Sequence, residues 1–366
     1  MALAERLPDF PWDTLADARQ AAEAHPDGIV DLSVGTPVDP TPRLAIDALA
    51  AAGDSPGYPT VWGDPATRAA IRGYLERRWA SVPLSDASVM PVVGTKEVVG
   101  WLPTLLGIGD GAAVVFPECA YPTYEVGALT SGARAVALDE PEAVPADARL
   151  IWINSPANPS GRILSIAETR AFVAAARRVG AVLASDECYG EFAWEAEPVS
   201  VLDPRVNDGD LTGLLAVHSL SKRSNVAGYR AGFVAGDPVV VQELVAARKH
   251  LGMMLPRPVQ AAMAALLGDQ DHVEEQRARY LSRRALLRPA LEAAGFRVDH
   301  SEGSLYLWAT RDEDCRASVA WLADRGILAA PGDFYGPAAA RHVRVALTAT
   351  DERVAAAAAR LSPYAP

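Results

Sequence analysis

Residues 214–235, with the sequence LLAVHSLSKRSNVAGYRAGFVA, are the stretch that says most about the fold of this chain. A largely apolar run over 214–218 leads into a polar segment that contains Lys222 and Gly228. A second apolar run follows over 232–235. Short apolar runs bounded by turn residues are typical of strands buried in a sheet. The stretch therefore predicts two buried strands, with a lysine just after the first.

The same pattern extends outward over about residues 88 to 236, where short apolar runs alternate with helical segments. The predicted strands are 112–116, 135–138, 150–153, 182–185, 214–218 and 232–235. Alternation of this kind predicts an α/β fold with a mainly parallel sheet flanked by helices. The continuous apolar character of the runs predicts burial on both faces of the sheet.

Three predicted helices carry recognisable boundary residues. Ser165 and Glu168 form a capping box before an alanine-rich helix that Gly180 should end. Two further helices are predicted to begin where an aspartate precedes a first-turn proline, at Asp64-Pro65 and Asp237-Pro238.

After about residue 275 the pattern changes to that of a smaller α+β domain. Helix-like and strand-like segments alternate and lead to a final alanine-rich helix; they lie at 274–291, 304–309, 317–324 and 342–347. We therefore predict a large domain over 41–275 and a small domain over 276–366. The N-terminal segment, 1–40, is predicted to join the small domain.

Composition excludes several classes of protein. The chain has 366 residues, 50% of them hydrophobic, and a formal net charge of -12 without a run of Lys or Arg, so no nucleic-acid partner is expected. Cys119, Cys188 and Cys315 are too far apart for a structural zinc site, and we expect reduced thiols and no metal. No signal-like or membrane-spanning apolar stretch is visible, which predicts a cytoplasmic protein.

The polar segment after the first strand can carry chemistry. A partly desolvated lysine such as Lys222 can become a neutral amine and form an imine with an aldehyde. Arg230 would return a guanidinium to the same place, where together with Ser219 and Ser221 it could hold a phosphate dianion. By itself Ser-x-Ser-Lys is more often an ordinary surface turn.

Polar residues also follow two earlier strands. A carboxylate such as Asp186, at a buried strand end, can keep a pyridine nitrogen protonated, and Tyr189 could bond the phenolic oxygen of the same ring. Asn158, in a turn shaped by Pro159, can aim an amide donor at that oxygen. The alternatives are an acidic helix cap for Asp186 and a plain turn around Asn158.

Two further motifs suit a flat anionic ligand. Thr95 and Lys96 open an apolar helix, whose first backbone N–H groups could bind an anion. Tyr121 could place an aromatic face against a flat ring. Here the alternatives are a plain N-cap at Thr95 and a core tyrosine at position 121.

Taken together, the five motifs resemble the fold-type I pyridoxal 5'-phosphate enzymes, specifically the class I/II aminotransferases, over nearly the whole chain. The resemblance implies that Lys222 holds the cofactor as a Schiff base and acts as general base. It implies Asp186 as the pyridinium partner, Asn158 and Tyr189 as ligands of the phenolic oxygen, and Tyr121 as the stacking aromatic. The implied phosphate ligands are Thr95, Lys96, Ser219, Ser221 and Arg230.

The same resemblance implies residues for the substrate and for a second subunit. Arg344 would clamp the α-carboxylate of an amino or keto acid, assisted by the backbone of Gly35 and by Asn158. Tyr58 would reach the phosphate of the neighbouring subunit, which implies a homodimer with shared active sites.

Three stretches, 7–13, 57–63 and 117–124, look like those of actinobacterial N-succinyldiaminopimelate aminotransferases. That resemblance implies N-succinyl-LL-2,6-diaminopimelate and 2-oxoglutarate as substrates, in lysine biosynthesis. Trp62, Lys96 and Arg257 are candidates for binding the distal end of the substrate, and Lys96 could instead serve the phosphate or only the surface. Another class I/II aminotransferase, of aspartate or LL-diaminopimelate type, and a β-lyase remain alternatives. A DNA-binding regulator on this fold would carry a basic segment, which is not visible.

Overall fold

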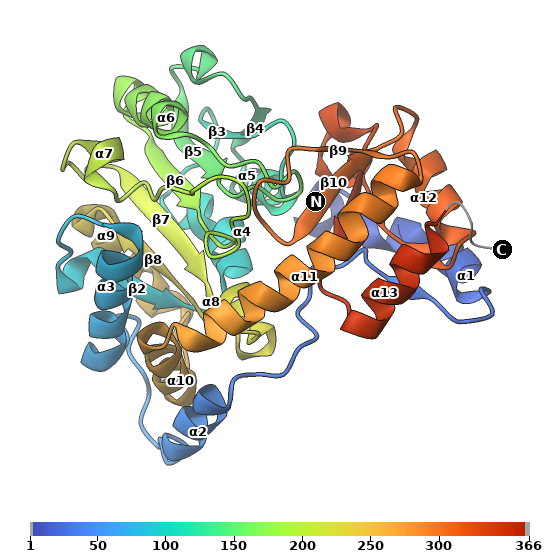
Figure 1. Cartoon of the computed structure of the whole chain (residues 1–366). Helices are drawn as coiled ribbons and strands as arrows, with labels where there is room; N and C mark the ends of the chain where they lie inside the picture. Colours follow the sequence, from blue (N-terminus) through green and yellow to red (C-terminus); the bar gives the residue numbers. More distant parts are fainter. Residues whose placement is uncertain (1–2, 363–366) are drawn as a thin grey trace.

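The computed structural model describes residues 3–362 and shows an α/β fold. Within these residues the strands form a seven-stranded, a four-stranded and a two-stranded sheet. Figure 1 shows a larger body around the seven-stranded sheet and a smaller body beside it. The long helix α11 (Asp271–Ala293) runs from one body to the other. The predicted fold class is confirmed.

The seven-stranded sheet has the order β2-β8-β7-β6-β5-β3-β4. Six of its strands point the same way, and only β8 runs antiparallel to its two neighbours. All six predicted strands are present. The bounds are β2 (Val89–Val92), β3 (Ala113–Phe116), β4 (Arg134–Ala137), β5 (Ala148–Asn154), β6 (Val182–Asp186), β7 (Leu214–Ser219) and β8 (Gly232–Gly236).

Two features of this sheet differ from the prediction, and both lie at its edges. Strand β2 was not among the predicted strands. Its Pro91 cannot donate to a ladder, and β2 tolerates this residue as an edge strand. Strand β4 was predicted to be buried on both faces, which is wrong. It is the other edge strand, and its residues are exposed or only partly buried.

Helices cover both faces of this sheet. Successive strand residues point to opposite faces, so Ile151 packs in one core and Trp152 in the other. The first core also contains residues of α3 (Pro65–Trp79), α6 (Ile166–Val179) and α10 (Arg257–Gly268). The second contains residues of α4 (Thr95–Leu105), α5 (Thr123–Ser131) and α9 (Pro238–Leu251). The sheet is therefore buried between two helical layers.

The predicted helix boundaries are confirmed. Ser165 accepts a hydrogen bond from the backbone of Glu168 in a complete capping box, and α6 ends at Gly180 in the left-handed conformation. The side chains of Asp64 and Asp237 cap α3 and α9. A capping side chain of this kind stabilises a helix by about 1 kcal/mol.

The smaller body is built on the antiparallel sheet β12-β13-β10-β9. Its elements are β9 (Arg297–Asp299), β10 (Tyr306–Thr310), α12 (Cys315–Ala323), β11 (Ile327–Leu328), β12 (Ala330–Pro331), β13 (Val343–Ala346) and α13 (Asp351–Arg360). The remaining elements are α1 (Ala16–Glu23), β1 (Val30–Asp31), α2 (Arg43–Ala51), α7 (Pro204–Asn207), α8 (Leu220–Arg223) and the 3-10 turns η1 (Leu3–Arg6), η2 (Pro11–Leu15), η3 (Asp86–Ser88), η4 (Pro141–Ala143), η5 (Ala227–Tyr229), η6 (Gly332–Tyr335) and η7 (Pro337–Ala339).

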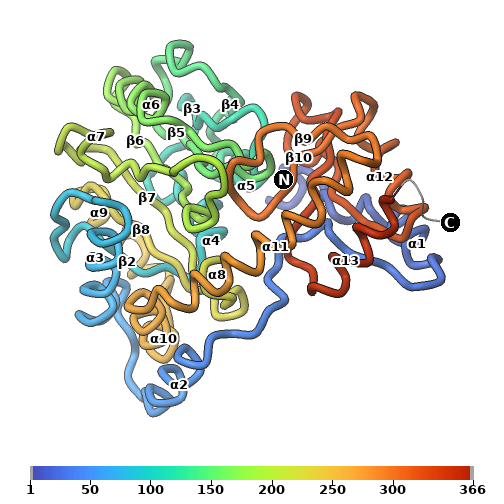
Figure 2. Tube along the Cα trace, viewed as in Figure 1, coloured from blue at the N-terminus to red at the C-terminus, as the bar shows by residue number. Residues whose placement is uncertain are grey.

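The N-terminal segment lies against the C-terminal part of the chain. Strand β1 pairs in parallel with β11, and α1 packs on α12. In Figure 2 the blue N-terminal tube lies beside the red C-terminal elements before it crosses to α2 at the larger body. The domain division at 40/41 and 275/276 stays a proposal. Residues 1–2 and 363–366 of the predicted domains lie outside the described residues, and α11 is continuous across position 275.

A chain of polar contacts on α11 connects the two bodies. Asn225 donates to Gln276 at 2.8 Å, and Gln276 donates to Asp39 at 2.7 Å. Asp39 in turn accepts two hydrogen bonds from Arg283, which is 2% exposed as a side chain. Helix α11 therefore joins the segment after Lys222 to the segment that follows β1.

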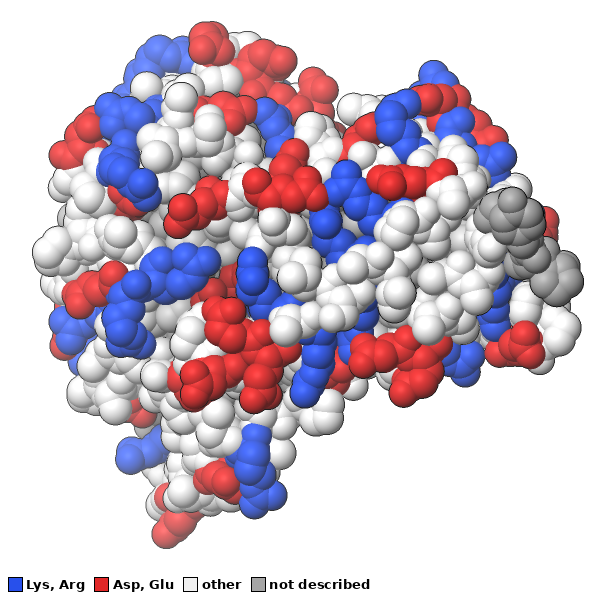
Figure 3. All heavy atoms as spheres, in the orientation of Figure 1, with Lys and Arg blue, Asp and Glu red and all other residues white. Residues whose placement is uncertain are grey.

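Charges of both signs are interspersed over the face shown in Figure 3. Glu195, for example, pairs with both Arg284 and Arg288 of α11. Among the helices of residues 3–362, none has the length and apolar character needed to cross a membrane.

Candidate active site

The carboxyl ends of β3, β5, β6 and β7 meet at one edge of the large sheet, because these strands are parallel. A cavity of about 570 Å³ lies there, within the range of roughly 300–1,000 Å³ usual for small-molecule sites. Twelve residues predicted from the sequence line it: Gly35, Thr95, Lys96, Tyr121, Asn158, Asp186, Tyr189, Ser219, Ser221, Lys222, Arg230 and Arg344. A larger cavity, of about 720 Å³, contains none of them.

Lys222 enters the cavity from the short helix α8, directly after β7. The hydroxyl of Ser219 accepts the backbone N–H two residues on, so that the chain turns as soon as the strand ends. The Nζ of Lys222 donates to the carbonyl of Gly35. Burial, followed by the nearby charge of Arg344, lowers the pKa of Lys222 although Tyr306 opposes the shift. A lowered pKa favours the neutral amine, which is the form that attacks an aldehyde.

Asp186 ends β6 and is 7% exposed. Tyr124 donates to its Oδ2 at 2.9 Å, and the backbone N–H of Cys188 donates to its Oδ1 at 3.2 Å. No Lys or Arg within residues 3–362 forms an ion pair with this carboxylate, and burial raises its pKa. A cationic group in the cavity would therefore stabilise the charged form of Asp186. No helix follows β6 directly, so the alternative of an acidic helix cap is wrong.

The start of α4 and the guanidinium of Arg230 lie against each other. Gly94 has φ +78°, and a Cβ at this position would lie 2.3 Å from the Nη2 of Arg230. Only glycine at position 94 therefore allows Arg230 to lie this close to the start of α4. The backbone N–H groups of the helix and the guanidinium are thus brought together, and both kinds of donor can bind an anion. Gly94 is the N-cap and Thr95 the first helical residue, so the alternative of Thr95 as a plain N-cap is wrong. Lys96 is exposed at the rim, with its Nζ 5.7 Å from the ring centre of Phe10.

Arg344 enters the cavity from β13 and is 3% exposed. Its Nη1 donates to the Oδ1 of Asn158 at 2.8 Å, and its Nη2 donates to the carbonyl of Ser33 at 2.7 Å. The Cζ lies 4.0 Å from the ring centre of Tyr306. The Nε is buried without a hydrogen-bond partner among the described residues. This guanidinium is therefore held in place and retains capacity for an anionic ligand.

Tyr306 joins the two sides of the cavity. Its hydroxyl lies 2.9 Å from that of Tyr189. It also lies so close to Gly35 that a Cβ there would stand 2.0 Å from the phenolic oxygen. Gly35 is thus required for close packing beside the amine of Lys222.

Three predicted residues lie outside this cavity. Tyr58 is 97% exposed and, together with Arg257, lines a separate hollow. Trp62 is partly buried against the core that contains α4. The structure of one chain does not bring these three side chains to Lys222, and the role of Tyr58 depends on a second subunit.

The site also contains residues that were not predicted to serve it. Tyr124 ends the stretch 117–124, but nothing in the sequence told which tyrosine would meet Asp186. Tyr306 lies in a predicted strand with no motif around it. Phe10 and Trp12 line the cavity from the N-terminal segment. Their only signal in the sequence was the family resemblance of the stretch 7–13.

Comparisons with known proteins agree with this arrangement. The family model "Aminotransferase class I and II" matches residues 27–361. The probable aminotransferase Rv1178 of Mycobacterium tuberculosis is 60% identical over 97% of this chain and 85% of its own length. The 4-dedimethylamino-4-oxo-anhydrotetracycline transaminase OxyQ of Streptomyces rimosus is 56% identical over 97% of this chain and 99% of its own length.

Solved structures show the same fold. An aminotransferase from Staphylococcus aureus superposes with a TM-score of 0.89 at 26% identity, covering 100% of this chain and 99% of the other. A probable N-succinyldiaminopimelate aminotransferase from Thermus thermophilus superposes with a TM-score of 0.86 at 25% identity, covering 96% of this chain and 99% of the other. The chain therefore belongs to the class I and II aminotransferases, a family that depends on pyridoxal 5'-phosphate.

Proposed function

We propose that this aminotransferase exchanges an amino group between N-succinyl-LL-2,6-diaminopimelate and 2-oxoglutarate. The observation that carries the chemistry is the meeting of Lys222, Asp186 and Arg344 in one cavity. A partly buried amine, a buried carboxylate and a buried guanidinium there match the aldehyde, the ring nitrogen and the substrate carboxylate that transamination must accommodate.

The residues of the cavity fit the cofactor. Asp186 has no cationic partner among the described residues, and a protonated pyridine nitrogen would supply one. The first turn of α4 and Arg230 would hold the phosphate, together with Ser219 and Ser221. When bound, the cofactor supplies an electron sink for the electrons left on the substrate's Cα.

The chain's own groups would then divide the work. Lys222 would hold the cofactor through Nζ and, once released, carry the proton taken from the substrate's Cα. Tyr121 would stack against the ring. The Oδ1 of Asn158 is occupied by Arg344, which leaves its Nδ2 to donate to the phenolic oxygen, beside the hydroxyl of Tyr189.

Two observations support the succinylated substrate. The stretches 7–13, 57–63 and 117–124 resemble those of enzymes for this substrate, and a structural relative carries a probable name of the same kind. The relative OxyQ favours a second candidate, the amination of a polycyclic ketone. Arg344 does not separate these candidates, because an amino donor in either reaction presents an α-carboxylate.

A panel of amino donors and acceptors tests the proposal. We expect the highest kcat/KM for N-succinyl-LL-2,6-diaminopimelate with 2-oxoglutarate. The glutamate that this reaction forms is measured spectrophotometrically. Unsuccinylated LL-diaminopimelate, aspartate and a polycyclic ketone with glutamate serve as the comparison set. A higher kcat/KM for any of these would reject the succinylated substrate, and release of an α,β-eliminated product without 2-oxoglutarate would instead support a lyase.

Arg344→Lys should weaken both half-reactions by comparable factors. Lysine cannot reproduce the two parallel hydrogen bonds of a guanidinium to a carboxylate, and breaking such a buried pair costs about 2 to 5 kcal/mol in binding. The measurement is kcat/KM for donor and acceptor, with the visible absorbance of the cofactor as a control that should not change. Wild-type kcat/KM for both partners would remove Arg344 from the site.

A further inference from the structure

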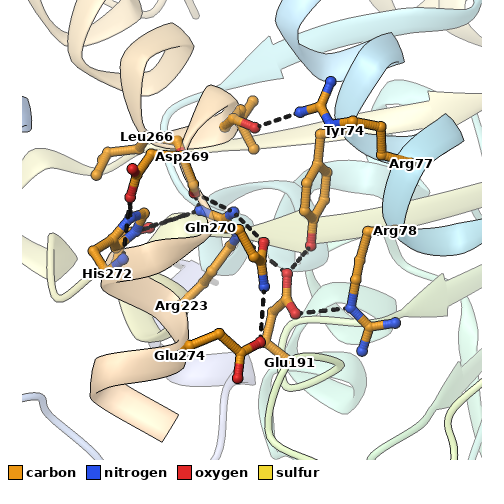
Figure 4. A network of polar contacts seen from close by, with 12 residues as sticks. Tyr74, Arg77, Arg78, Glu191, Arg223, Leu266, Asp269, Gln270, His272 and Glu274 are labelled. Atoms are coloured by element: carbon orange, nitrogen blue, oxygen red, sulfur yellow. Dashed lines mark hydrogen bonds and ion pairs between the residues drawn. The ribbon is translucent and has the colours of Figure 1, made fainter.

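Arg223, the residue directly after Lys222, lies in a buried polar cluster (Figure 4). Its side chain is 4% exposed. Both ends of the guanidinium are bonded: Nε donates to the carboxylate of Glu191 at 3.2 Å and Nη1 donates to the carbonyl of Leu266 at 2.9 Å. The Nη2 donates to the carbonyl of Asp269 at 3.2 Å and to the side chain of Gln270 at 3.3 Å.

On one side this cluster is fixed to the larger body. Glu191 accepts a hydrogen bond from Tyr74 at 2.8 Å and from Arg78 at 2.9 Å. Burial alone would raise the pKa of Glu191, but Arg223 and Arg78 hold it below the ordinary value, so the carboxylate is charged. The ring of Tyr74 also lies 4.8 Å from the Cζ of Arg223. The guanidinium is therefore held by a charge and by an aromatic face.

On the other side the cluster is fixed to the junction of α10 and α11. Leu266 lies in the last turn of α10, and Asp269 and Gln270 precede α11. The Oγ of Ser224 accepts from the Nη1 of Arg223 at 3.1 Å and lies 2.9 Å from the Nε2 of His272, in the first turn of α11. The segment that carries Lys222 is thus attached to the start of the helix that leads to the smaller body.

Helix α8 cannot hold this geometry unaided. It has four residues, and helices so short are unstable without tertiary contacts. Lys222, one of these four residues, has a long flexible side chain that must reach one point in the cavity. Arg223 is the side chain of α8 that bonds both the larger body and the α10–α11 junction.

We infer that Arg223 is a positioning residue for Lys222: it orients α8 so that the amine points into the cavity, and it makes that orientation depend on where α11 begins. The inference rests on the proposed role of Lys222. The planar guanidinium is needed, because an ammonium group cannot donate along the same fixed directions.

The test compares Arg223→Lys with Arg78→Lys. The second substitution also removes a contact to Glu191, but Arg78 belongs to α3 and not to α8. In Arg223→Lys we expect kcat to fall about 10- to 100-fold, the loss typical of a catalytic group misplaced by about 1 Å. We expect KM to change little, and the pH midpoint of the cofactor's visible absorbance to shift. Arg78→Lys should leave kcat and this midpoint at wild-type values. Thermal denaturation reports how far each substitution loosens the fold.

Equal kcat values and equal absorbance midpoints in the two variants would overturn the inference, leaving Arg223 a structural residue only. Should Arg223→Lys fail to fold, Arg223→Gln is measured instead, because its shorter side chain cannot reach both Glu191 and the α10–α11 junction; wild-type kcat and a wild-type midpoint in that variant would overturn the inference as well. Failure of the proposed function looks different. It would appear in the wild-type protein itself, as absent absorbance or absent transamination.

Discussion

Replacement of Lys222 by alanine is expected to remove both the yellow absorbance of the lysine-bound cofactor and the turnover. The amine is proposed as the covalent anchor and as the proton carrier, and general acid–base catalysis alone contributes about 10²- to 10⁴-fold. We therefore expect a loss of kcat at or beyond the upper end of that range. Absorption spectra and single-turnover assays of the purified variant measure the two effects separately.

The chain offers an unusually clean control for this experiment, because it contains only three lysines, Lys96, Lys222 and Lys249. Borohydride reduction followed by peptide mass spectrometry should place the cofactor on Lys222 alone. Lys249→Ala, an exposed change on α9, should leave spectrum and rate unchanged. A cofactor adduct on Lys96 or Lys249, or a Lys222→Ala protein that stays yellow, would contradict the assignment.

A mixture of Lys222→Ala and Tyr58→Phe protomers tests whether a dimer shares its active sites. If it does, a mixed dimer contains one intact site, and the mixture should be more active than the Lys222→Ala protein alone.

Asp186→Ala is expected to lower kcat by about 10²- to 10³-fold, the range for loss of one preorganised electrostatic group. Without the carboxylate, the ring nitrogen would lose its proton and the ring would withdraw electrons poorly. The substitution also leaves the hydroxyl of Tyr124 without its acceptor, which costs about 1 to 3 kcal/mol of stability. Steady-state kinetics and thermal denaturation measure these losses.

Asp186→Asn separates the two effects, because an amide oxygen can still accept from Tyr124 while the charge is gone. We expect this variant to keep most of its stability and to lose turnover almost as severely as the alanine variant. Near-normal turnover in Asp186→Asn would show that the charge of this carboxylate is not needed.

The fold could be predicted where local chemistry decides it. Buried strands such as 182–185 are continuous apolar runs, and the caps at Ser165 and Asp237 are local side-chain contacts. The errors lie where position in the sheet decides. Pro91 is compatible with a strand only at an edge, and of the two edge strands β4 is exposed whereas β2 is buried. Neither fact is present in the residues themselves.

The site could be predicted where residues are placed by strand ends. Asp186, Asn158 and Lys222 follow three adjacent parallel strands, so their meeting is a consequence of sheet order. The contacts of Tyr306 and Arg223 could not be predicted, because each depends on how distant elements pack. Tyr58 remains a prediction, since its proposed partner belongs to another chain.

The contact of Arg344 with the carbonyl of Ser33 joins residues 311 positions apart. During synthesis the N-terminal segment emerges first, and its strand partner β11 and the arginine of β13 emerge last. At typical translation rates of about 5 to 20 residues per second, Ser33 waits roughly 15 to 60 s for Arg344. Leu15, Val30 and Leu32 spend that interval without the C-terminal residues that bury them in the finished protein. These apolar side chains of the N-terminal segment therefore stay without their native partners for most of the synthesis of the chain.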